Sequence, residues 1–561
     1  MPITKITIEN FKGIRERVEI PLRPITLLFG ANSAGKSTLL QALLYFRELL
    51  ERQNADADQL LASGEMIDLG GFRQLVHGHN LTRKVRIGVE ITIDDDGLPT
   101  IPTADYRPSH PWDVQSPKDD ELVLLGIEGV TGVALAYVEV TVEWYASHQK
   151  PYITEYRVEL NGEPAATIKS IPGFPAHLGG INISHSLFPS QFEDEAPDLF
   201  PENNLISQQL STAITGTEFI GPSGFSDGNF PLEGGVIPGP RQPLNFSYDR
   251  NSDDGREAAG LGFPFVEYLY SQLMVSPGEL VLNELKRIRY IGPIRSIPKR
   301  QFNESRSPKD DAWSDGRAAW ALLASKARAG DSYDMEFIEE VSRCLAGENR
   351  LNLGYQLIAQ ASYQLPADSI LLASLELAKS RLSRAGEDED ADEMLTPILD
   401  GIRGLQQSVQ LKLVDGTNNT EVDPCDVGVG VSQVVPIIVG ALAPGAGVMA
   451  VEQPELHLHP AIQCSLADVF VKEVHENDDR IFLLETHSEH LLLRLMKRIR
   501  QTSAGDLAEG ARSLTPDLIS VLYVEPYEGR SVFREMPINS QGELIKAWPG
   551  GFFEEDLDEL L

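Results

Sequence analysis

The residues with the clearest chemistry are Gly30 to Ser37, which read Gly-Ala-Asn-Ser-Ala-Gly-Lys-Ser. This is the complete G-x-x-x-x-G-K-[ST] pattern of a phosphate-binding loop. Gly30 and Gly35 let the backbone curl so that its N–H groups point at a phosphate, at the positive end of a helix. Lys36 would reach the β- and γ-phosphates, and the Ser37 hydroxyl would ligate Mg²⁺. The pattern therefore predicts binding of Mg²⁺ with a nucleoside triphosphate, ATP or GTP.

The residues on either side of this loop supply the elements that position it. The apolar run at 25–29 predicts a buried strand, and apolar residues at helical spacing from 38 to 44 predict a helix. We expect strands over 3–9 and 25–29 and a helix over 37–52. The loop is thus predicted to lie between a strand and a helix, which is the context in which this motif binds phosphate.

Two apolar strands near the other end of the chain also end in polar side chains. The segment VMAVEQPELHLHP (448–460) has the form of a Walker B strand, and Glu452 stands where a carboxylate holds Mg²⁺ through water. The segment IFLLETHS (481–488) ends in a Thr-His-Ser triplet centred on His487. A histidine at a strand end beside the γ-phosphate can sense or stabilise its charge. We interpret His487 in this way rather than as an ordinary surface histidine.

A glycine-rich segment, DVGVGVSQ at 426–433, stands just before an apolar helix and the Walker B strand. Glycines and a serine ahead of a helix N-terminus form a surface that suits an anion. A plain flexible loop is the alternative reading. The place of the segment shortly before the Walker B strand favours the anion-binding interpretation.

The spacing of these motifs predicts the fold class. Lys36 and Glu452 lie near opposite ends of a chain of 561 residues, whereas a compact GTPase or kinase-like P-loop domain closes its site within one domain. We therefore expect an α/β fold in which one P-loop nucleotide site is assembled from both chain ends, an arrangement that resembles the ABC-type ATPase head. A large β-rich and helical middle region is inserted between the two halves.

The middle of the chain reads as a β-rich part followed by a helical part. Alternating apolar and polar residues at 85–93, 135–145 and 152–160 predict an antiparallel sheet attached to the core, with an Asn-Gly hairpin turn at 161–162. The stretch 172–262 is rich in Pro, Gly, Asn and Ser and predicts long loops. Helices are predicted at 263–290, 317–329, 333–346, 367–384 and 391–407.

A chain of this length is expected to form two to four domains or lobes. We divide it into an N-terminal ATPase half with the Walker A loop (1–92) and an inserted β-rich and loop-rich region (93–262). A helical region (263–408) follows. The C-terminal ATPase half covers 409–561 and contains the signature-like segment 426–433, the Walker B strand, the segment 481–488 with the switch histidine candidate His487, and a cap.

Composition narrows the range of partners and compartments. The chain has 48 basic and 83 acidic residues, a net charge of −35, so contact with DNA would need a local basic patch. Its three cysteines are far apart and support neither a disulfide framework nor a zinc site, so a reducing cytoplasm is expected. The N-terminus lacks the apolar core of a signal peptide. The longest apolar stretch, 434–451, is broken by Pro and Gly, which favours a helix, a turn and a strand over a membrane span.

One local basic patch is present at 286–309. Its basic residues are opposed within that stretch only by Glu304, and Tyr290 and Phe302 lie among them. The basic residues are Lys286, Arg287, Arg289, Arg295, Lys299, Arg300, Arg306 and Lys309. They could bind phosphates of a nucleic acid or pair with the surplus of carboxylates, and both readings stay open. A second basic stretch with Arg494, Lys497, Arg498 and Arg500 reads as the solvated face of a helix, and the acidic run at 387–393 as a solvated loop or helix start.

These motifs together resemble the ABC-class ATPases of the RecF, SMC and OLD (overcoming lysogenisation defect) group. The resemblance covers about residues 1–80 and 410–561 and also includes Tyr290-Ile-Gly-Pro-Ile-Arg295. It rests on IENFKG at 8–13, the Walker A loop, GVGVSQ, EQPELHLHP and ETHSEH. The segment WPGGFF at 548–553 is similar to the domain that ends a bacterial subfamily of this group, one without a Toprim nuclease domain.

The resemblance implies roles for individual residues. ATP and Mg²⁺ would be bound by Gly30, Asn32, Ser33, Gly35, Lys36, Ser37 and Thr38, with Glu452 as the Walker B acid. In a head-to-tail, ATP-dependent homodimer or higher oligomer, the partner's γ-phosphate would be contacted by Gly430, Ser432 and Gln433. His487 would be the switch histidine. Gln74 would be the Q-loop glutamine, which also serves the metal, or else part of a plain surface loop.

The sequence departs from this family at one catalytic position. Most ABC ATPases have a glutamate after the Walker B acid, and this chain has Gln453. Glutamine can orient water but cannot take its proton. Either Glu455 supplies the carboxylate, or hydrolysis is slow and ATP acts mainly as a switch. Glu455 would also suit a structural role near His457 and His459.

The resemblance also bears on biological role. Similar proteins are ATPase subunits of bacterial phage-defence systems beside a separately encoded nuclease or toxin, and this is the expected role. A RecF-like DNA repair or chromosome-maintenance ATPase is the alternative. A transporter ATPase subunit is disfavoured, because such subunits lack the inserted middle region. Tyr523-Val-Glu525 faintly resembles a Toprim acidic motif, but too little sequence follows for a nuclease domain.

Overall fold

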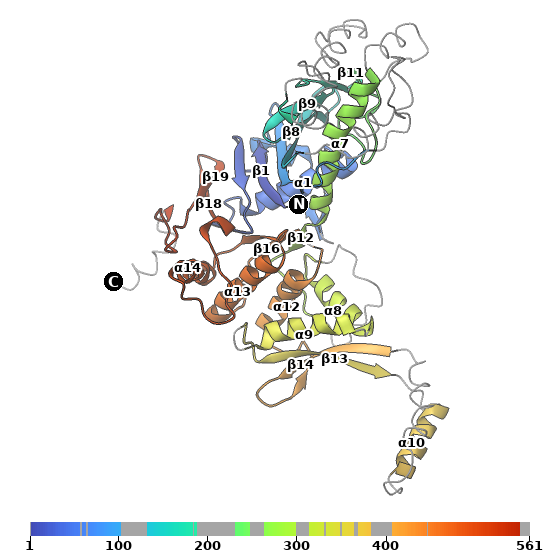
Figure 1. Cartoon of the computed structure of the whole chain (residues 1–561), viewed down its shortest axis with the longest axis vertical. Coiled ribbons are helices and arrows are strands. Elements are labelled where there is room, and N and C mark those ends of the chain that lie inside the picture. The colour runs from blue at the N-terminus through green and yellow to red at the C-terminus, as the bar shows by residue number, and fades with distance from the viewer. Residues whose placement is uncertain are drawn as a thin grey trace, which may run out of the picture.

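Strands from the two ends of the chain lie side by side at the centre of the computed structural model (Figure 1). The structure describes residues 2–56, 59–62, 65–101, 132–182, 185–187, 230–246, 263–298, 313–329, 332–347, 350–363, 369–382, 407–445 and 447–549. Its central sheet has the order β12-β16-β17-β3-β18-β19 and is parallel except for β19. The strands are β3 (Ile25–Gly30), β12 (Arg289–Ile291), β16 (Val448–Glu452), β17 (Ile481–Glu485), β18 (Ile519–Tyr527) and β19 (Arg530–Glu535). The predicted assembly of one head from both chain ends is confirmed.

Alternate residues of the parallel strands pack into two different hydrophobic cores, one on each face of the sheet. Val448 and Ala450 of β16 pack in the core that contains α1 (Lys36–Arg52), whereas Met449 and Val451 pack in the core of the C-terminal helices. Strands buried on both faces are apolar throughout rather than alternating, which is why 448–451 and 481–484 read as continuous apolar runs. The C-terminal helices are α12 (Val429–Leu442), α13 (Pro460–Glu476) and α14 (Glu489–Ala504). The apolar stretch 434–451 thus forms a helix, a turn and a strand, as predicted.

An antiparallel sheet of eight strands packs over α1. Its order is β11-β10-β9-β8-β7-β6-β1-β2, so the N-terminal strands continue directly into the predicted β-rich region across residue 92. The hairpin turn at 161–162 has positive φ at both positions, 51° at Asn161 and 82° at Gly162, as the Asn-Gly pair predicts. The strands are β1 (Ile3–Glu9), β2 (Val18–Pro21), β6 (Val85–Thr92), β7 (Leu135–Tyr145), β8 (Lys150–Leu160), β9 (Glu163–Lys169), β10 (His177–Gly179) and β11 (Phe230–Pro231).

The stretch predicted as long loops, 172–262, differs from that prediction in its described part. It contains β10 and β11, which extend the antiparallel sheet because each finds a neighbour to pair with. Residues 183–184, 188–229 and 247–262 lie outside the described residues. Two further short elements, β4 (Gln59–Ala62) and β5 (Glu65–Asp68), form a small hairpin, and α2 (Phe72–Leu75) follows it.

The region predicted as helical, 263–408, contains strands as well as helices. α7 (Phe263–Lys286) packs on α1 and the antiparallel sheet, and α8 (Arg317–Ala329) and α9 (Ser332–Ala346) pack against α12. β12, predicted as the end of a helix, is a strand because it pairs with Met449–Val451 of β16. β13 (Tyr355–Tyr363) and β14 (Gln407–Asp415) form a ribbon edged by β15 (Glu421–Val422), with α10 (Ile370–Leu382) beyond it (Figure 1). The helix predicted at 391–407 lies outside the described residues except for Gln407, which is in β14.

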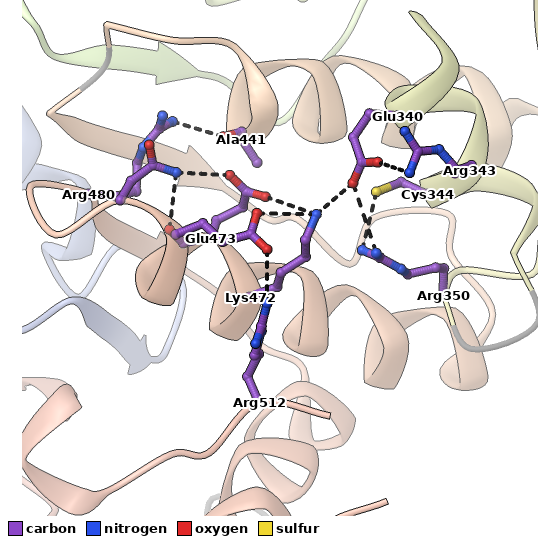
Figure 2. Close-up of polar contacts among 11 residues, drawn as sticks. Glu340, Arg343, Cys344, Arg350, Ala441, Lys472, Glu473, Arg480 and Arg512 are labelled. Atoms are coloured by element: carbon purple, nitrogen blue, oxygen red, sulfur yellow. Dashed lines mark hydrogen bonds and ion pairs between the residues drawn. The ribbon is translucent and has the colours of Figure 1, made fainter. Parts of the chain in front are cut away.

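Figure 2 shows a network of ion pairs and hydrogen bonds that connects α9 to the C-terminal part of α13. Lys472 Nζ of α13 lies 2.6 Å from Glu340 Oε1 of α9, and Glu340 also pairs with Arg343 at 2.9 Å. Beyond α13, buried Arg480 donates a hydrogen bond of 2.9 Å to the carbonyl oxygen of Ala441 in α12. The network therefore joins α9, α13 and the C-terminal end of α12. Within the described part of the chain, no helix has both the length and the apolar character needed to cross a membrane.

Candidate nucleotide site

The P-loop connects β3 to α1 at the carboxyl edge of the parallel sheet. Gly30 and Gly35 have φ of 140° and 103°, which side-chain-bearing residues rarely adopt. A Cβ at Gly30 would lie 2.1 Å from the Val524 carbonyl oxygen, and one at Gly35 would lie 2.4 Å from Ser531 Oγ. Gly35 is the N-cap of α1 and has no side chain, so the N–H groups of the first turn receive no side-chain cap from it. The first turn is therefore suited to an anion.

Lys36 is folded into this loop. Its Nζ donates hydrogen bonds to the carbonyl oxygens of Gly30 at 2.9 Å and Ala31 at 3.0 Å and lies 3.7 Å from Glu485 Oε1. Burial lowers the pKa of Lys36, and the nearby carboxylates of Glu485, Glu452 and Glu455 oppose that shift. The ammonium group thus has oxygen partners already placed around it, and phosphate oxygens would replace some of them.

Glu485 is a site residue that the sequence reasoning missed. It ends β17, where it pairs in register with Glu452 of β16 and Leu28 of β3. Ser37 Oγ donates to Glu485 Oε2 at 2.7 Å. The signal was present in the sequence, because IFLLE ends in an acid just as VMAVE does. Glu485 therefore contacts the Walker A serine and lysine, and Glu452 ends the neighbouring strand.

Glu452 lies at the end of β16 and accepts a hydrogen bond of 3.1 Å from the Tyr290 hydroxyl of β12. Ser37, Glu452 and Glu485 supply hydroxyl and carboxylate oxygens, the ligands that Mg²⁺ prefers. Such a set suits Mg²⁺, which usually keeps several waters and shares its protein ligands with phosphates. The residues present therefore fit the expected metal.

Glu455 holds the loop that carries the predicted switch histidine. Its two carboxylate oxygens accept hydrogen bonds of 2.7 Å from Thr486 Oγ1 and from the backbone N–H of His487. This geometry favours the structural role for Glu455. Burial and the neighbouring Lys36 lower the pKa of His487, against an opposing effect of Glu485, so its imidazole is neutral at neutral pH.

Gln453 starts the turn after Walker B. Its φ is 47°, a left-handed conformation that is uncommon for residues other than glycine. Its backbone N–H donates a hydrogen bond of 2.7 Å to the Glu485 carbonyl oxygen. The turn is therefore tied to the strand that carries Glu485.

The glycine-rich segment was predicted to stand ahead of a helix, but its residues from Val429 onward lie inside the helix. α12 begins at Val429 with Gly428 as N-cap, so Ser432 and Gln433 fall on the inward face of the helix. Ser432 is 0% exposed and Gln433 is 5% exposed, so neither side chain can meet a partner's phosphate in this conformation. Val429, by contrast, is 46% exposed. Gly430 fits closely against the His457 carbonyl oxygen, 2.6 Å from where a Cβ would stand.

The remaining predicted residues differ in their exposure. Asn32 and Ser33 are exposed on the P-loop, and Thr38 is buried in α1. Gln74 is exposed on α2 beside Gly70, and none of the described hydrogen bonds or ion pairs joins it to Ser37 or Glu452. Its role as the Q-loop glutamine stays a prediction.

The described part of the basic patch is engaged within the protein. Lys286 lies 3.3 Å from Glu51, Arg287 lies 2.8 Å from Glu284, and Arg289 donates to backbone carbonyls at the end of α12. Arg295 is buried. Lys299, Arg300, Phe302, Glu304, Arg306 and Lys309 lie outside the described residues, as does the acidic run 387–393. In the second basic stretch Arg494 and Arg498 both pair with Asp468 at 2.6 Å. The described residues of the first patch thus favour pairing within the protein, and Arg498 of the second stretch is buried rather than on a solvated helix face as predicted.

The C-terminal segment contacts the P-loop and the strand that leads into it. Ser531 Oγ donates a hydrogen bond of 2.6 Å to the Ala34 carbonyl oxygen. Trp548 makes edge-on contacts with Phe29 and with Tyr523, at centroid distances of 5.4 and 5.9 Å. The remainder of the predicted C-terminal motif, 550–553, lies outside the described residues.

Comparison with known proteins gives two family matches and several similar structures. Residues 1–102 match the model described as "AAA ATPase domain", and residues 300–494 match "AAA domain, putative AbiEii toxin, Type IV TA system". No curated protein matches the chain.

Similar solved structures include an Smc head bound to the C-winged helix domain of ScpA, with 10% identity, a TM-score of 0.37, and 96% and 98% of the two chains covered. An SMC head domain from Thermotoga maritima has 7% identity, a TM-score of 0.34, and 96% and 100% coverage. An Smc head with coiled coil and joint from Pyrococcus yayanosii has 12% identity, a TM-score of 0.35, and 96% and 98% coverage. TM-scores below 0.5 do not establish that two proteins share a fold, so no property of these structures is transferred to the chain.

The two family matches fall on the two parts of the chain that meet at this site. The first contains the P-loop, and the second contains Glu452 and Glu485. The central sheet joins these parts by hydrogen bonds between β17 and β3. Both halves of this nucleotide site thus lie in segments that are similar to AAA-type ATPase domains.

Proposed function

We propose that this protein binds and slowly hydrolyses MgATP in the cytoplasm, and that ATP closes two copies head to tail to control a separately encoded effector in bacterial anti-phage defence. The observation that carries the proposal is the convergence of Lys36, Ser37, Glu452, Glu485 and His487, from both chain ends, on one sheet edge. The description of the matched AbiEii-type family supports the defence setting.

Different residues of the site would bind different parts of MgATP. Lys36 would exchange its carbonyl partners for β- and γ-phosphate oxygens, and the first turn of α1 would donate N–H groups to the same phosphates. Ser37, Glu452 and Glu485 would hold Mg²⁺, which supplies charge neutralisation between the phosphates when bound. Neutral His487 can donate or accept a hydrogen bond beside them.

Turnover is expected to be slow because Gln453 has no carboxylate. Its amide can orient water but cannot act as a general base. Glu455 is the nearest alternative in the sequence, yet both its oxygens accept hydrogen bonds from the 486–487 loop. ATP thus serves chiefly as a switch between open and closed states.

The start of α12 offers a surface for the second copy. Val429 is 46% exposed at the N-terminus of this helix, and Ile294, in the loop held by Gln433 of the same helix, is 82% exposed. Exposed apolar side chains beside a helix N-terminus suit an interface that closes over a phosphate. Backbone N–H groups of this first turn, rather than the buried Ser432, would contact the partner's nucleotide.

The DNA repair alternative has less support. The described basic residues at 286–295 pair with carboxylates, donate to carbonyls or are buried, so they are not presented to a nucleic acid. The described part of the patch therefore does not support DNA as the partner, and a separately encoded nuclease or toxin remains the partner that we propose.

Lys36→Ala tests the basis of the proposal. Losing this buried cation should weaken MgATP binding roughly 100-fold, about 3 kcal/mol, in isothermal titration calorimetry. Lys150→Ala, at the exposed start of β8, is the matched control and should bind as the wild type does. Unchanged binding by Lys36→Ala would refute the assignment of the nucleotide site.

A further inference from the structure

We propose that Arg295 is a positioning residue that couples the Walker B turn of its own nucleotide site to α12, the helix that faces the partner's site. The inference rests on the proposed ATP-dependent dimer and names the element that would make its two sites interdependent. Three observations support it: the hydrogen bonds of the Arg295 side chain, those of its backbone, and the guanidinium donors that have no partner among the described residues.

The side chain of Arg295 holds the Walker B turn. It is 2% exposed, and its Nη2 donates to the carbonyl oxygens of Glu452 at 2.7 Å and Gln453 at 3.2 Å. Gln453 has the left-handed φ of 47°, a conformation that persists only when its surroundings enforce it. Arg295 binds this turn from one side, and the Glu485 carbonyl binds the Gln453 N–H from the other. The directions of the Glu452 and Gln453 side chains therefore depend on Arg295.

The backbone of Arg295 is held by α12. Gln433 Nε2 donates to the Arg295 carbonyl oxygen at 2.6 Å, and the Arg295 N–H donates to Gln433 Oε1 at 3.3 Å. The side-chain amide nitrogen and oxygen of buried Gln433 thus both form hydrogen bonds with the backbone of Arg295. Gln433 stands one helical turn after Val429, the exposed start of α12. A shift of α12 must therefore move Arg295, and Arg295 must move the Walker B turn or break its hydrogen bonds.

The guanidinium of Arg295 has N–H donors that form no hydrogen bond with the described residues. Among the described residues, Arg295 Nε and Nη1 are buried without a hydrogen-bond partner. Burial lowers the pKa of Arg295 to about 10, and Glu455, Tyr290 and Glu452 favour its charged form. When the turn moves, the Arg295 guanidinium can exchange its present carbonyl partners for other oxygens. The exchange is favourable because buried N–H donors are costly to leave unpaired, and the new oxygens would pair with them. This property suits a two-state contact.

The coupling works in both directions by thermodynamic necessity. MgATP drawn to Glu452 would shift the turn and, through Arg295 and Gln433, the start of α12, which strengthens dimerisation. Dimerisation would in turn fix α12 and set the Walker B turn for hydrolysis. Hydrolysis per chain is therefore expected to rise with protein concentration.

The test compares variants that break each half of the bridge. Arg295→Lys keeps the charge and loses the forked donor, while Gln433→Met leaves the Arg295 side chain intact. Each should bind MgATP within about threefold of the wild type, yet weaken ATP-dependent association by about tenfold in sedimentation velocity. The double variant should be no worse than either single variant, because both break one path. Arg480→Lys is the matched control, since buried Arg480 also donates to backbone carbonyls at the far end of α12. It should leave association unchanged, and thermal unfolding checks that every variant folds.

Additive effects of the two single variants, or association of Arg295→Lys equal to that of the wild type, would overturn the inference while leaving the ATP-dependent dimer intact. A weakening by Arg480→Lys equal to that by Arg295→Lys would also overturn it, because the effect would then be general loosening of α12. Wild-type protein that binds MgATP without associating would overturn both the dimer and the inference.

Discussion

The hydroxyl of Ser37 donates a hydrogen bond of 2.7 Å to the carboxylate of Glu485, across 448 positions of the chain. This contact joins the Walker A helix to the strand that precedes the predicted switch histidine. The other Glu485 oxygen lies 3.7 Å from Lys36 Nζ. Glu485 therefore contacts two residues that the nucleotide and its metal would bind, and its charge bears on both.

Glu485→Gln should reduce the dependence of ATP binding on Mg²⁺. The amide can still accept from Ser37, but the negative charge that repels free triphosphate and attracts the metal is lost. The ratio of ATP affinity with Mg²⁺ to that in EDTA, measured by calorimetry, should fall by about tenfold, 1.4 kcal/mol. Glu489→Gln, at the start of α14, should leave the ratio unchanged. An unaltered ratio in Glu485→Gln would exclude it from the metal site.

Glu455→Gln should release the 486–487 loop. An amide cannot accept with both ends, so one of the two hydrogen bonds from Thr486 and His487 is lost. We expect ATP binding to persist, turnover to fall, and the His487 amide to exchange hydrogen about tenfold faster. The exchange measurement separates the two roles of Glu455. Loss of turnover with unchanged exchange would instead identify it as the general base.

Val429→Arg should block closure of the dimer without affecting the P-loop. A large cation at the exposed start of α12 adds bulk and places positive charge at the positive end of the helix. Sedimentation velocity with MgATP should show the variant as unassociated at concentrations where the wild type associates. Leu493→Arg, at a similarly exposed position of 48% on α14, is the control. Equal association of Val429→Arg and the wild type would move the interface elsewhere.

Glu473→Gln should stabilise the protein at alkaline pH. Burial raises the pKa of Glu473 from 4.5 to about 7, with Glu476 and Glu340 acting in the same direction and Lys472 and Arg480 opposing. The folded state therefore holds a proton that the unfolded state has lost, and stability falls as pH rises from about 4.5 to about 7. The neutral amide avoids this loss, so the variant should gain about 2 kcal/mol relative to wild type between pH 5 and pH 8.

Denaturant unfolding at the two pH values measures this difference. Glu509→Gln, in an exposed loop, is the control and should show no pH-dependent gain. If Glu473→Gln has the same effect at pH 5 and pH 8, Glu473 is ionised in the folded protein, and the network in Figure 2 carries its full charge.

Local features of the sequence determined much of this protein. The P-loop could be read at Gly30–Ser37 because its chemistry depends on consecutive residues and on glycines at two positions of positive φ. β1 and β7 have the predicted bounds, since strand alternation and apolar runs report burial directly. The split head also followed from sequence, because two halves of one known site stood at opposite ends of the chain.

Tertiary structure alone decided which side chains meet or are hidden. Ser432 was predicted to lie ahead of a helix N-terminus, yet α12 begins at Val429 and turns Ser432 inward. Arg295 read as part of a surface patch, since the sequence of an arginine does not show whether carbonyls will surround it. Glu485 became a site residue through the register of β17 between β16 and β3. Such relationships depend on pairing between distant segments. A local pattern, such as an acid at the end of an apolar strand, can mark a candidate residue, but it does not show which side chains that residue meets.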